Sequence, residues 1–188
     1  MRRPYIAVLA LTAALLLTLP ASGSEKADVA LPDTVAVEGA TLVLNGIALR
    51  EKFVFDVYVA ALYLSEKNNN ATLILEQDAP RMMVMHFVRN VDAKSINKAW
   101  LDGLAANAPD ASAELKAKFA ELCLMMEDIK KGQEMGFAYT PATGTDIMVA
   151  GQTRGGIPGK DFADAILATW IGPKPGPGEK FKAGLLGK

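Results

Sequence analysis

The chain has 188 residues, with 20 basic and 21 acidic side chains, a formal charge of −1, and 51% hydrophobic residues. This composition suits a single domain with a buried core and excludes an intrinsically disordered chain. A charge this close to zero gives no reason to expect a nucleic-acid partner. One His and one Cys exclude an internal disulfide and a metal site built from these residues.

The first 23 residues are predicted to be a secretory signal. Two arginines at the start precede an apolar run over residues 6–19, and the small residues Ala21 and Gly23 mark the expected cleavage site. The run is shorter than the roughly 20 residues of a bilayer span, so an uncleaved anchor is the alternative interpretation. We therefore expect residues 24–188 to be exported, to the periplasm in a bacterium, and to carry no membrane span.

Strands are predicted in the first half of the mature chain. Residues 24–34 are polar and contain proline, and we expect them to form a loose lead-in to a domain over residues 35–188. From residue 35 onward, β-prone and alternating residues predict strands. The predicted elements are strands at 35–37 and 41–44, a turn at Asn45 and Gly46, and strands at 53–64 and 81–88.

The strand over residues 53–64 has two different faces. One face, from Phe53 to Tyr63 in steps of two, is wholly apolar, whereas the other carries Asp56 and Tyr58 among hydrophobic residues. Arg50 shares the side of these two polar residues if no bulge intervenes. Two interpretations stay open: Arg50 and Asp56 form an ion pair, or Arg50 and Tyr58 bind a carboxylate or enolate at an apolar pocket.

Helices are predicted mainly in the second half, where apolar residues recur at steps of three and four. Asp92 or Ser95 can cap the first helix, and Gly132 is expected to end the second. The predicted elements are a helix to Asn107, a helix over 115–129, strands over 134–140, 145–150 and 153–157, a helix over 162–171, and a short last helix ending at Leu185 and Leu186. This order predicts an α+β fold with an antiparallel sheet covered by helices.

Three features that suggest chemistry have simpler explanations. His86 has no partner at metal-ligand spacing, so we expect it to pack in or beside the core. Cys123 lies on the apolar side of its predicted helix and is expected to be a small core residue. Residues 155–161 are glycine-rich, but Arg154 and Asp161 stand where a phosphate loop needs Gly and Ser or Thr. The sequence therefore predicts no cofactor.

The order of several short motifs resembles the chalcone isomerase-like family, in particular its exported bacterial branch. The motifs are Leu44-Asn45-Gly46-Ile47-Ala48-Leu49-Arg50, Val57-Tyr58-Val59-Ala60, Met85-His86-Phe87-Val88-Arg89-Asn90, Tyr139-Thr140-Pro141, Ile157-Pro158-Gly159-Lys160-Asp161-Phe162 and Trp170-Ile171-Gly172. The resemblance covers about residues 37–188. It implies an open-faced β-sandwich, in which a large antiparallel sheet is backed by helices with a cleft between them.

The resemblance also implies where a catalytic site would lie, and the sequence departs from it. Plant enzymes of the family use an Arg, a Tyr and a Thr, with an Asn and a Ser or Thr framing the pocket. Local alignment places Gly46 at the Arg, Tyr58 at the Thr, Ile96 at the Tyr, Gly103 at the Asn and Ala163 at the Ser or Thr. These exchanges predict a more apolar cleft, in which Arg50 is the nearby Arg able to meet an anion.

Three functions follow as hypotheses. The leading one is a non-catalytic, cofactor-free protein that binds a fatty acid or similar lipophilic carboxylate. Arg50 and Tyr58 would hold the head group, and Ile96, Gly103 and Ala163 would line the cleft. The second is an isomerase, an intramolecular lyase for a chalcone-like phenol, with Arg50 and Tyr58 as rearranged donors. The third is an accessory protein that binds a protein partner.

Overall fold

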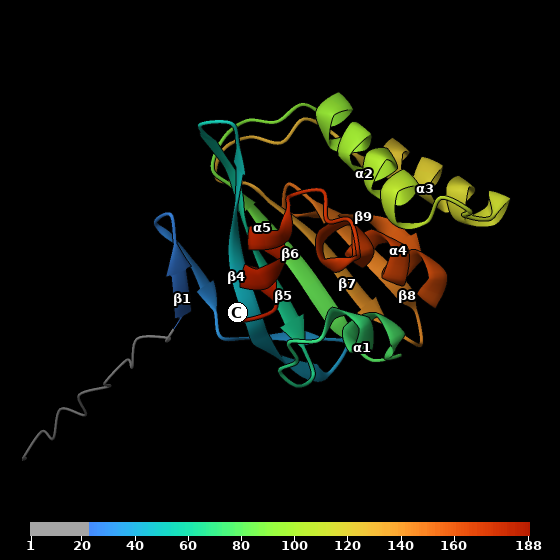
Figure 1. Ribbon diagram of the computed structural model, residues 1–188, viewed down its shortest axis with the longest axis horizontal. Helices are drawn as coiled ribbons and strands as arrows, with labels where there is room; N and C mark the ends of the chain where they lie inside the picture. Colours follow the sequence, from blue (N-terminus) through green and yellow to red (C-terminus); the bar gives the residue numbers. More distant parts are fainter. Residues whose placement is uncertain (1–22) are drawn as a thin grey trace, which may run out of the picture.

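Seven antiparallel strands form one large sheet in the computed structural model, which describes residues 23–188 (Figure 1). The strands are β3 (Thr34–Val37), β4 (Ala40–Lys52), β5 (Phe55–Leu64), β6 (Arg81–Phe87), β7 (Glu134–Thr140), β8 (Gly144–Val149) and β9 (Gln152–Ile157). They lie side by side in chain order, so each strand pairs with its neighbours in the sequence. The secretory signal predicted over residues 1–23 lies outside the described residues, apart from Gly23.

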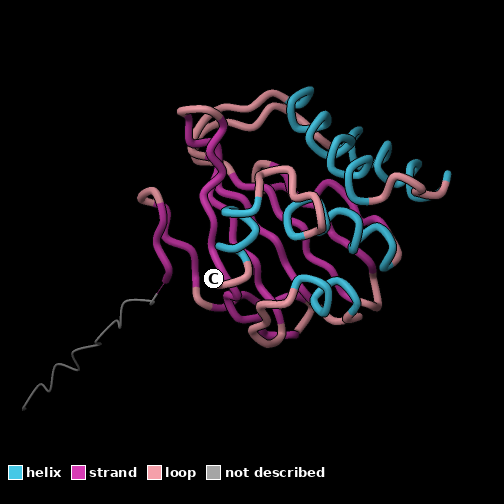
Figure 2. Tube along the Cα trace, viewed as in Figure 1, coloured by secondary structure: helices cyan, strands magenta, loops and turns pink. Residues whose placement is uncertain are grey.

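Helices cover one face of this sheet, as the tube in Figure 2 shows. They are α1 (Ala71–Glu76), α2 (Ala93–Asn107), α3 (Ala113–Met125), α4 (Lys160–Ile171) and α5 (Glu179–Leu185). The side chain of Asp92 accepts a hydrogen bond from the backbone N–H of Ser95 at 2.7 Å, which caps α2 as predicted. This arrangement confirms the predicted α+β class, with an antiparallel sheet backed by helices.

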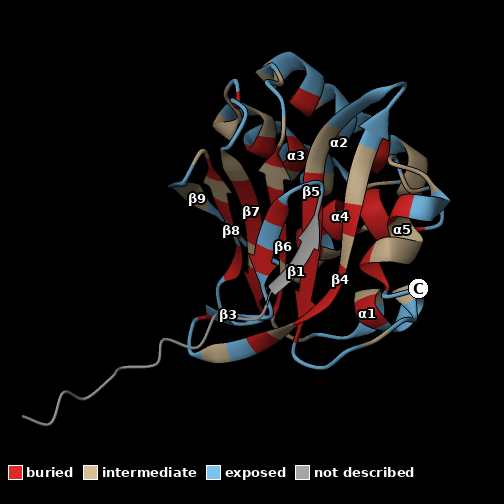
Figure 3. Cartoon of the chain, turned by 90° about the vertical axis from the view of Figure 1, so that its left-hand side faces the viewer, coloured by how far each residue is buried: buried red, intermediate tan, exposed pale blue. Residues whose placement is uncertain are grey.

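The two faces of β5 belong to two hydrophobic clusters. Ala60 and Leu62 face the helices and join the main core. Val59, Ala61 and Tyr63 face the other side and form a second cluster with residues from β3, β4 and the N-terminal hairpin. Both clusters are almost fully buried, and Figure 3 shows the resulting buried band along the central strands. Burial on both faces explains why this strand is so apolar.

Residues 24–34, predicted to be a loose lead-in, instead form most of a two-stranded hairpin. Strands β1 (Gly23–Lys26) and β2 (Val29–Pro32) pair antiparallel. Val29 and Leu31 alternate with exposed residues and are buried in the second cluster. The hydroxyl of Tyr63 donates a hydrogen bond to the carbonyl of Pro32 at 2.9 Å. The hairpin forms because its alternating apolar residues cover the face of β5 that the helices leave open.

The turn predicted at Asn45 and Gly46 is wrong, because β4 runs continuously through both residues. A register shift between Leu44 and Gly46 absorbs the irregularity. Asn45 donates from Nδ2 to the carbonyl of Leu185 at 2.8 Å and accepts from the amide of Asn68 at 2.7 Å. These contacts with distant segments replace the local turn that the dipeptide favours in isolation.

The second long helix is shorter than predicted, and one helix was not predicted at all. α3 ends at Met125, and Ile129 instead forms an isolated antiparallel bridge with Val91, with both N···O distances 2.9 Å. Ile129 is still buried, so its apolar side chain correctly indicated a core position, although the residue is not in a helix. α1 is a short helix capped by the side chain of Asn70. A helix this short has too little periodicity to be recognised.

Candidate functional site

A cleft of about 480 Å³ opens between the helix-covered face of the sheet and α2. The side chains around it come from β4, β5, β6, α2, α4 and the segment that joins α4 to α5. They are Arg50, Lys52, Val57, Tyr58, Met85, Phe87, Val91, Ser95, Ile96, Lys98, Ala99, Trp100, Asp102, Gly103, Ala106, Thr169, Trp170, Lys174, Gly176 and Pro177. A volume in the range of about 300–1,000 Å³ with mostly apolar walls is typical of a small-molecule site.

Aromatic side chains form the inner wall of the cleft. Trp100 of α2 packs edge-on against Trp170 of α4, with ring centroids 5.3 Å apart. Tyr58 of β5 packs against Phe87 of β6 at 5.5 Å. These contacts fix the rings between sheet and helices, so the wall is a rigid part of the core.

Tyr58 is the polar group of this wall. Its hydroxyl accepts a hydrogen bond from Nε1 of Trp170 at 3.2 Å. Burial raises the pKa of Tyr58 to about 12, although the hydrogen bond from Trp170 and the positive charge of Arg50 oppose the shift. The phenol is therefore neutral near pH 7, and its proton can be donated to an acceptor in the cleft.

Arg50 lies directly opposite Tyr58 in the register of β4 and β5. It is half-buried, and Nη1 donates a hydrogen bond to the carbonyl of Pro177 at 3.0 Å. Among the side chains described, those of residues 27–188, no carboxylate lies close enough to Arg50 to form an ion pair. This positive charge beside a neutral phenol makes the inner part of the cleft attractive to an anion.

The predicted alternative, an ion pair between Arg50 and Asp56, is not formed. β4 shifts register between Arg50 and Glu51, so that Asp56 lies opposite Glu51 while Arg50 lies opposite Tyr58. Asp56 is also exposed to solvent near the end of the hairpin. The bulge therefore places Asp56 beside Glu51, whereas Arg50 shares the cleft-facing side of the sheet with its partner Tyr58.

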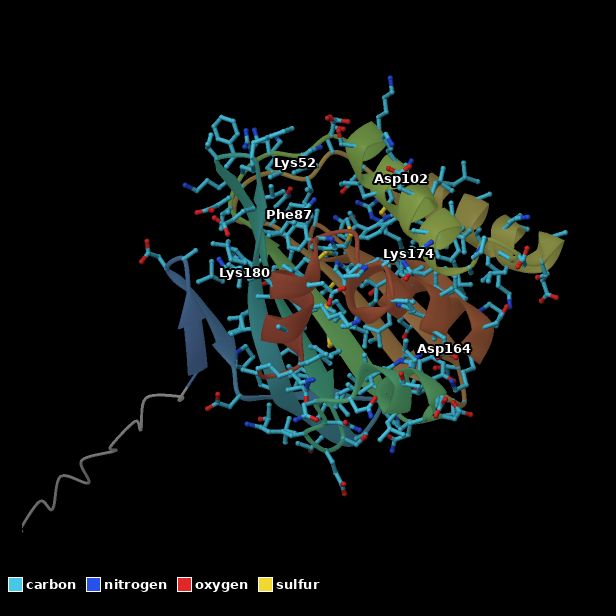
Figure 4. All side chains as sticks on the ribbon, in the orientation of Figure 1. Lys52, Phe87, Asp102, Asp164, Lys174 and Lys180 are labelled. Carbon is cyan, nitrogen blue, oxygen red and sulfur yellow. The ribbon has the colours of Figure 1, made fainter. Side chains whose placement is uncertain are left out.

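Lysines surround the rim of the cleft. Lys52, Lys98 and Lys174 are all exposed and line its opening. Lys98 is paired with Asp102 of the same helix at 2.5 Å. Figure 4 labels Lys52, Asp102 and Lys174 around the region where Phe87 lies. With Arg50, the lining carries four cations and one carboxylate, so its charge is positive.

Four of the five predicted site residues come together in this cleft, and one does not. Arg50, Tyr58, Ile96 and Gly103 line it, whereas Ala163 lies nearer the start of α4 and faces a separate cavity of about 20 Å³. That cavity has room for about one water molecule. The sequence analysis missed the aromatic wall and the lysine rim. The wall had a detectable signal in the tryptophans at helical positions, but the lysines had none.

Comparison with known proteins identifies the family of this chain. The chalcone isomerase-like family matches residues 23–187, nearly the whole chain. The chain belongs to the chalcone isomerase-like family. Among solved structures, the crystal structure of a fatty-acid-binding protein of Arabidopsis thaliana is similar, with a TM-score of 0.70 and 13% identity. The match covers 88% of this chain and 95% of that one, and it shows a shared fold. No curated protein matches significantly.

This family member has no room for a side chain at Gly46, the residue that the sequence analysis placed at the family's catalytic arginine. A Cβ atom at Gly46 would lie 2.3 Å from the carbonyl oxygen of Gly184 and 2.5 Å from that of Leu185. Both contacts are with the backbone of α5, which cannot give way as a flexible side chain could. The helix therefore occupies the space beside β4 at this position.

Neither a metal-binding cluster nor a membrane-spanning helix occurs in the part of this chalcone isomerase-like chain that the structure describes. No group of three or more His, Cys, Asp or Glu side chains within residues 23–188 is placed to hold a metal ion. In the same region, no helix has the length and apolar character needed to cross a membrane.

The raised pKa of Tyr58 predicts how this family member responds to alkali. In the unfolded chain the phenol ionises near pH 10, whereas in the folded protein it keeps its proton to about pH 12. The unfolded state therefore binds fewer protons between these values, and the free energy of unfolding falls as pH rises. Over this pH interval, we expect the free energy of unfolding of Tyr58→Phe to fall by about 1–2 kcal/mol less than that of wild type. Urea unfolding at both ends of the interval measures the difference. Equal losses in both proteins would place the Tyr58 hydroxyl in water.

Proposed function

We propose that this chain binds a fatty acid or a similar lipophilic carboxylate in the cleft between the sheet and α2, without catalysing a reaction. The observation that carries the proposal is the pairing of Arg50 and Tyr58 at one end of a mostly apolar cleft. A carboxylate could accept hydrogen bonds from the guanidinium and from the neutral phenol at once. The shared fold of the Arabidopsis fatty-acid-binding protein supports the same ligand class.

The walls of the cleft suit an alkyl chain. Met85, Ile96 and Trp100 offer apolar surface along its length, and methionine adapts to ligands of different shape. Each methylene group removed from water contributes about 0.8 kcal/mol. Such binding is non-directional, so affinity should increase with chain length until the cleft is full.

Two features argue against catalysis by the family's cyclisation chemistry. The raised pKa of Tyr58 makes its phenolate scarce near neutral pH, so the residue is a poor general base there. Gly46 leaves no side chain where the family's arginine would stabilise an oxyanion. The remaining groups can hold an anion, and the one carboxylate of the lining, Asp102, is exposed at the rim and paired with Lys98.

A ligand-retention experiment tests the proposal. Protein beginning at residue 24 is purified gently from the producing cells and analysed by native mass spectrometry, and then titrated with palmitate and with methyl palmitate. We expect bound carboxylic acids in the purified protein and tighter binding of palmitate than of its ester, because the ester carries no charge. An empty protein that binds neither compound would refute the proposal. Turnover of a chalcone that is lost in Arg50→Gln would support the isomerase instead.

We also propose that the chain works in the periplasm. The proposal rests on the positive start, the apolar run over residues 6–19 and the small residues before Ser24. Cell fractionation followed by N-terminal sequencing tests it. We expect the protein in the periplasmic extract with its first residue near Ser24, and an uncut chain in the cytoplasm would contradict the proposal.

A further inference from the structure

The tip of the β4–β5 hairpin exposes three large hydrophobic side chains. Phe53 is 91% exposed, Val54 88% and Phe55 54%. Phe53 also has φ of +57°, in the left-handed region that bulky residues rarely adopt. A turn made only to reverse the chain would favour Gly or Asn here. Two adjacent apolar residues held out in water at this turn therefore indicate a contact surface.

The hairpin stands clear of the rest of the sheet. β5 pairs with β6 only from Tyr58 onward. Nearer the tip, Phe55 and Asp56 of β5 pair only with Lys52 and Glu51 of β4. Figure 1 shows the tip extending past the ends of the neighbouring strands, beside the loops that precede α2 and β7. A projecting tip can enter a surface that the body of the protein does not touch.

Cations surround this tip. Lys52 precedes Phe53, and the guanidinium of Arg89 lies over the ring of Phe55, 4.5 Å from its centroid. Lys130 and Lys131 are exposed on the adjoining loop, whose backbone at Lys131 donates a hydrogen bond to the side chain of Asn90 at 2.9 Å. Across the described residues, none of these four cations lies within ion-pair distance of a carboxylate.

The acidic groups nearby are mostly engaged. Glu51 lies 3.7 Å from Lys180. Asp92 and Asp128 accept hydrogen bonds from backbone amides in the first turn of α2, at 2.7 Å and 2.9 Å. Asp56 is a second exposed carboxylate of the hairpin, and it lies opposite Glu51. With Lys180 included, five cations and four carboxylates lie around the tip, so the net charge there is slightly positive, and the four cations without a carboxylate partner are free to meet anionic groups.

We propose that this hairpin tip docks on the surface of an anionic phospholipid bilayer. Phe53 and Val54 enter the boundary between head groups and acyl chains, and Lys52, Arg89, Lys130 and Lys131 meet the lipid phosphates. Aromatic side chains are favoured at this depth, and long cationic side chains can reach back to the head groups. A protein partner is less suited, because a convex tip offers far less than the roughly 800 Å² per side of a stable interface.

The docking surface lies next to the cleft. Lys52 lines the opening of the cleft and also precedes the tip, and Arg50 lies two residues before Lys52 on β4. A bilayer contacted by Phe53 would therefore face the cleft opening, where a lipophilic ligand could pass from membrane to protein. The docking itself does not depend on what the cleft holds.

Vesicle flotation tests the docking. Wild type, Phe53→Ser/Val54→Ser and Leu124→Ser, all beginning at residue 24 to exclude the apolar leader, are mixed with vesicles of phosphatidylethanolamine and phosphatidylglycerol. Leu124 is a matched control because it is also 88% exposed but lies on α3. We expect wild type and Leu124→Ser to float, and the double variant to bind roughly tenfold or more weakly. Vesicles of phosphatidylcholine alone should bind wild type less, because they carry no net charge.

Further measurements separate docking from folding and from ligand binding. Palmitate affinity and circular dichroism of the double variant should equal those of wild type, since Phe53 and Val54 do not line the cleft. In Phe53→Trp, anionic vesicles should shift the fluorescence of the new indole to shorter wavelength. Absence of vesicle binding by wild type, or equal binding by the double variant, would overturn the proposal. So would a dimer that the double variant abolishes, because the tip would then contact a second copy.

Discussion

Arg50→Gln is expected to lower the affinity for palmitate by roughly tenfold to a hundredfold. The substitution removes the positive charge but keeps a polar side chain of similar reach. A hydrogen bond to a charged group contributes about 1.5–3 kcal/mol, which is the basis of the expected range. Arg50 is half-buried and has no carboxylate partner among the side chains of residues 27–188, so its charge is available to the ligand. Isothermal titration calorimetry measures the change directly.

Lys180→Gln is the matched control for this prediction. Lys180 also carries one positive charge, but its side chain is 94% exposed and lies 3.7 Å from Glu51, outside the cleft lining. We expect its palmitate affinity to equal that of wild type, because an exposed charge is screened by salt. Equal losses in both variants would show that only net charge matters. No loss in Arg50→Gln would place the carboxylate elsewhere in the cleft.

Gly46→Ala is expected to lower the free energy of unfolding by about 2–4 kcal/mol. The added Cβ would lie 2.3 Å from the carbonyl oxygen of Gly184, so α5 must move away from β4. That movement would also disturb the hydrogen bond from Asn45 to Leu185. Urea unfolding followed by circular dichroism measures the loss. For the same reason, Gly46→Arg should prevent correct folding and should not restore a catalytic arginine.

Gly176→Ala is the control for the effect of adding a methyl group. A Cβ there would meet only the carbonyl oxygen of Thr169, at an ordinary 3.6 Å. We expect a change of no more than about 0.5 kcal/mol. If Gly46→Ala proved as mild as Gly176→Ala, the close approach of α5 to β4 would be refuted.

The sequence by itself determined the fold class and the central elements. Alternation over residues 53–64 correctly predicted a strand with two different faces, although the strand begins only at Phe55, because side chains on a strand alternate whatever lies around it. The cap at Asp92 and the helical spacing after it predicted α2 for an equally local reason. The motif order indicated the family, which matches residues 23–187.

The tertiary structure alone decided how the site is assembled. Asn45 and Gly46 form a strand and not a turn because they contact α5, about 140 residues further along the chain. The register shift after Arg50 places Asp56 opposite Glu51 and leaves Arg50 without the predicted ion pair, and sequence parity holds no information about a bulge. Ala163 and Trp170 of α4 both line the small cavity, but of the two only Trp170 also reaches the cleft. Local pattern determines which face a residue occupies within its own element, but the packing of elements determines what that face meets.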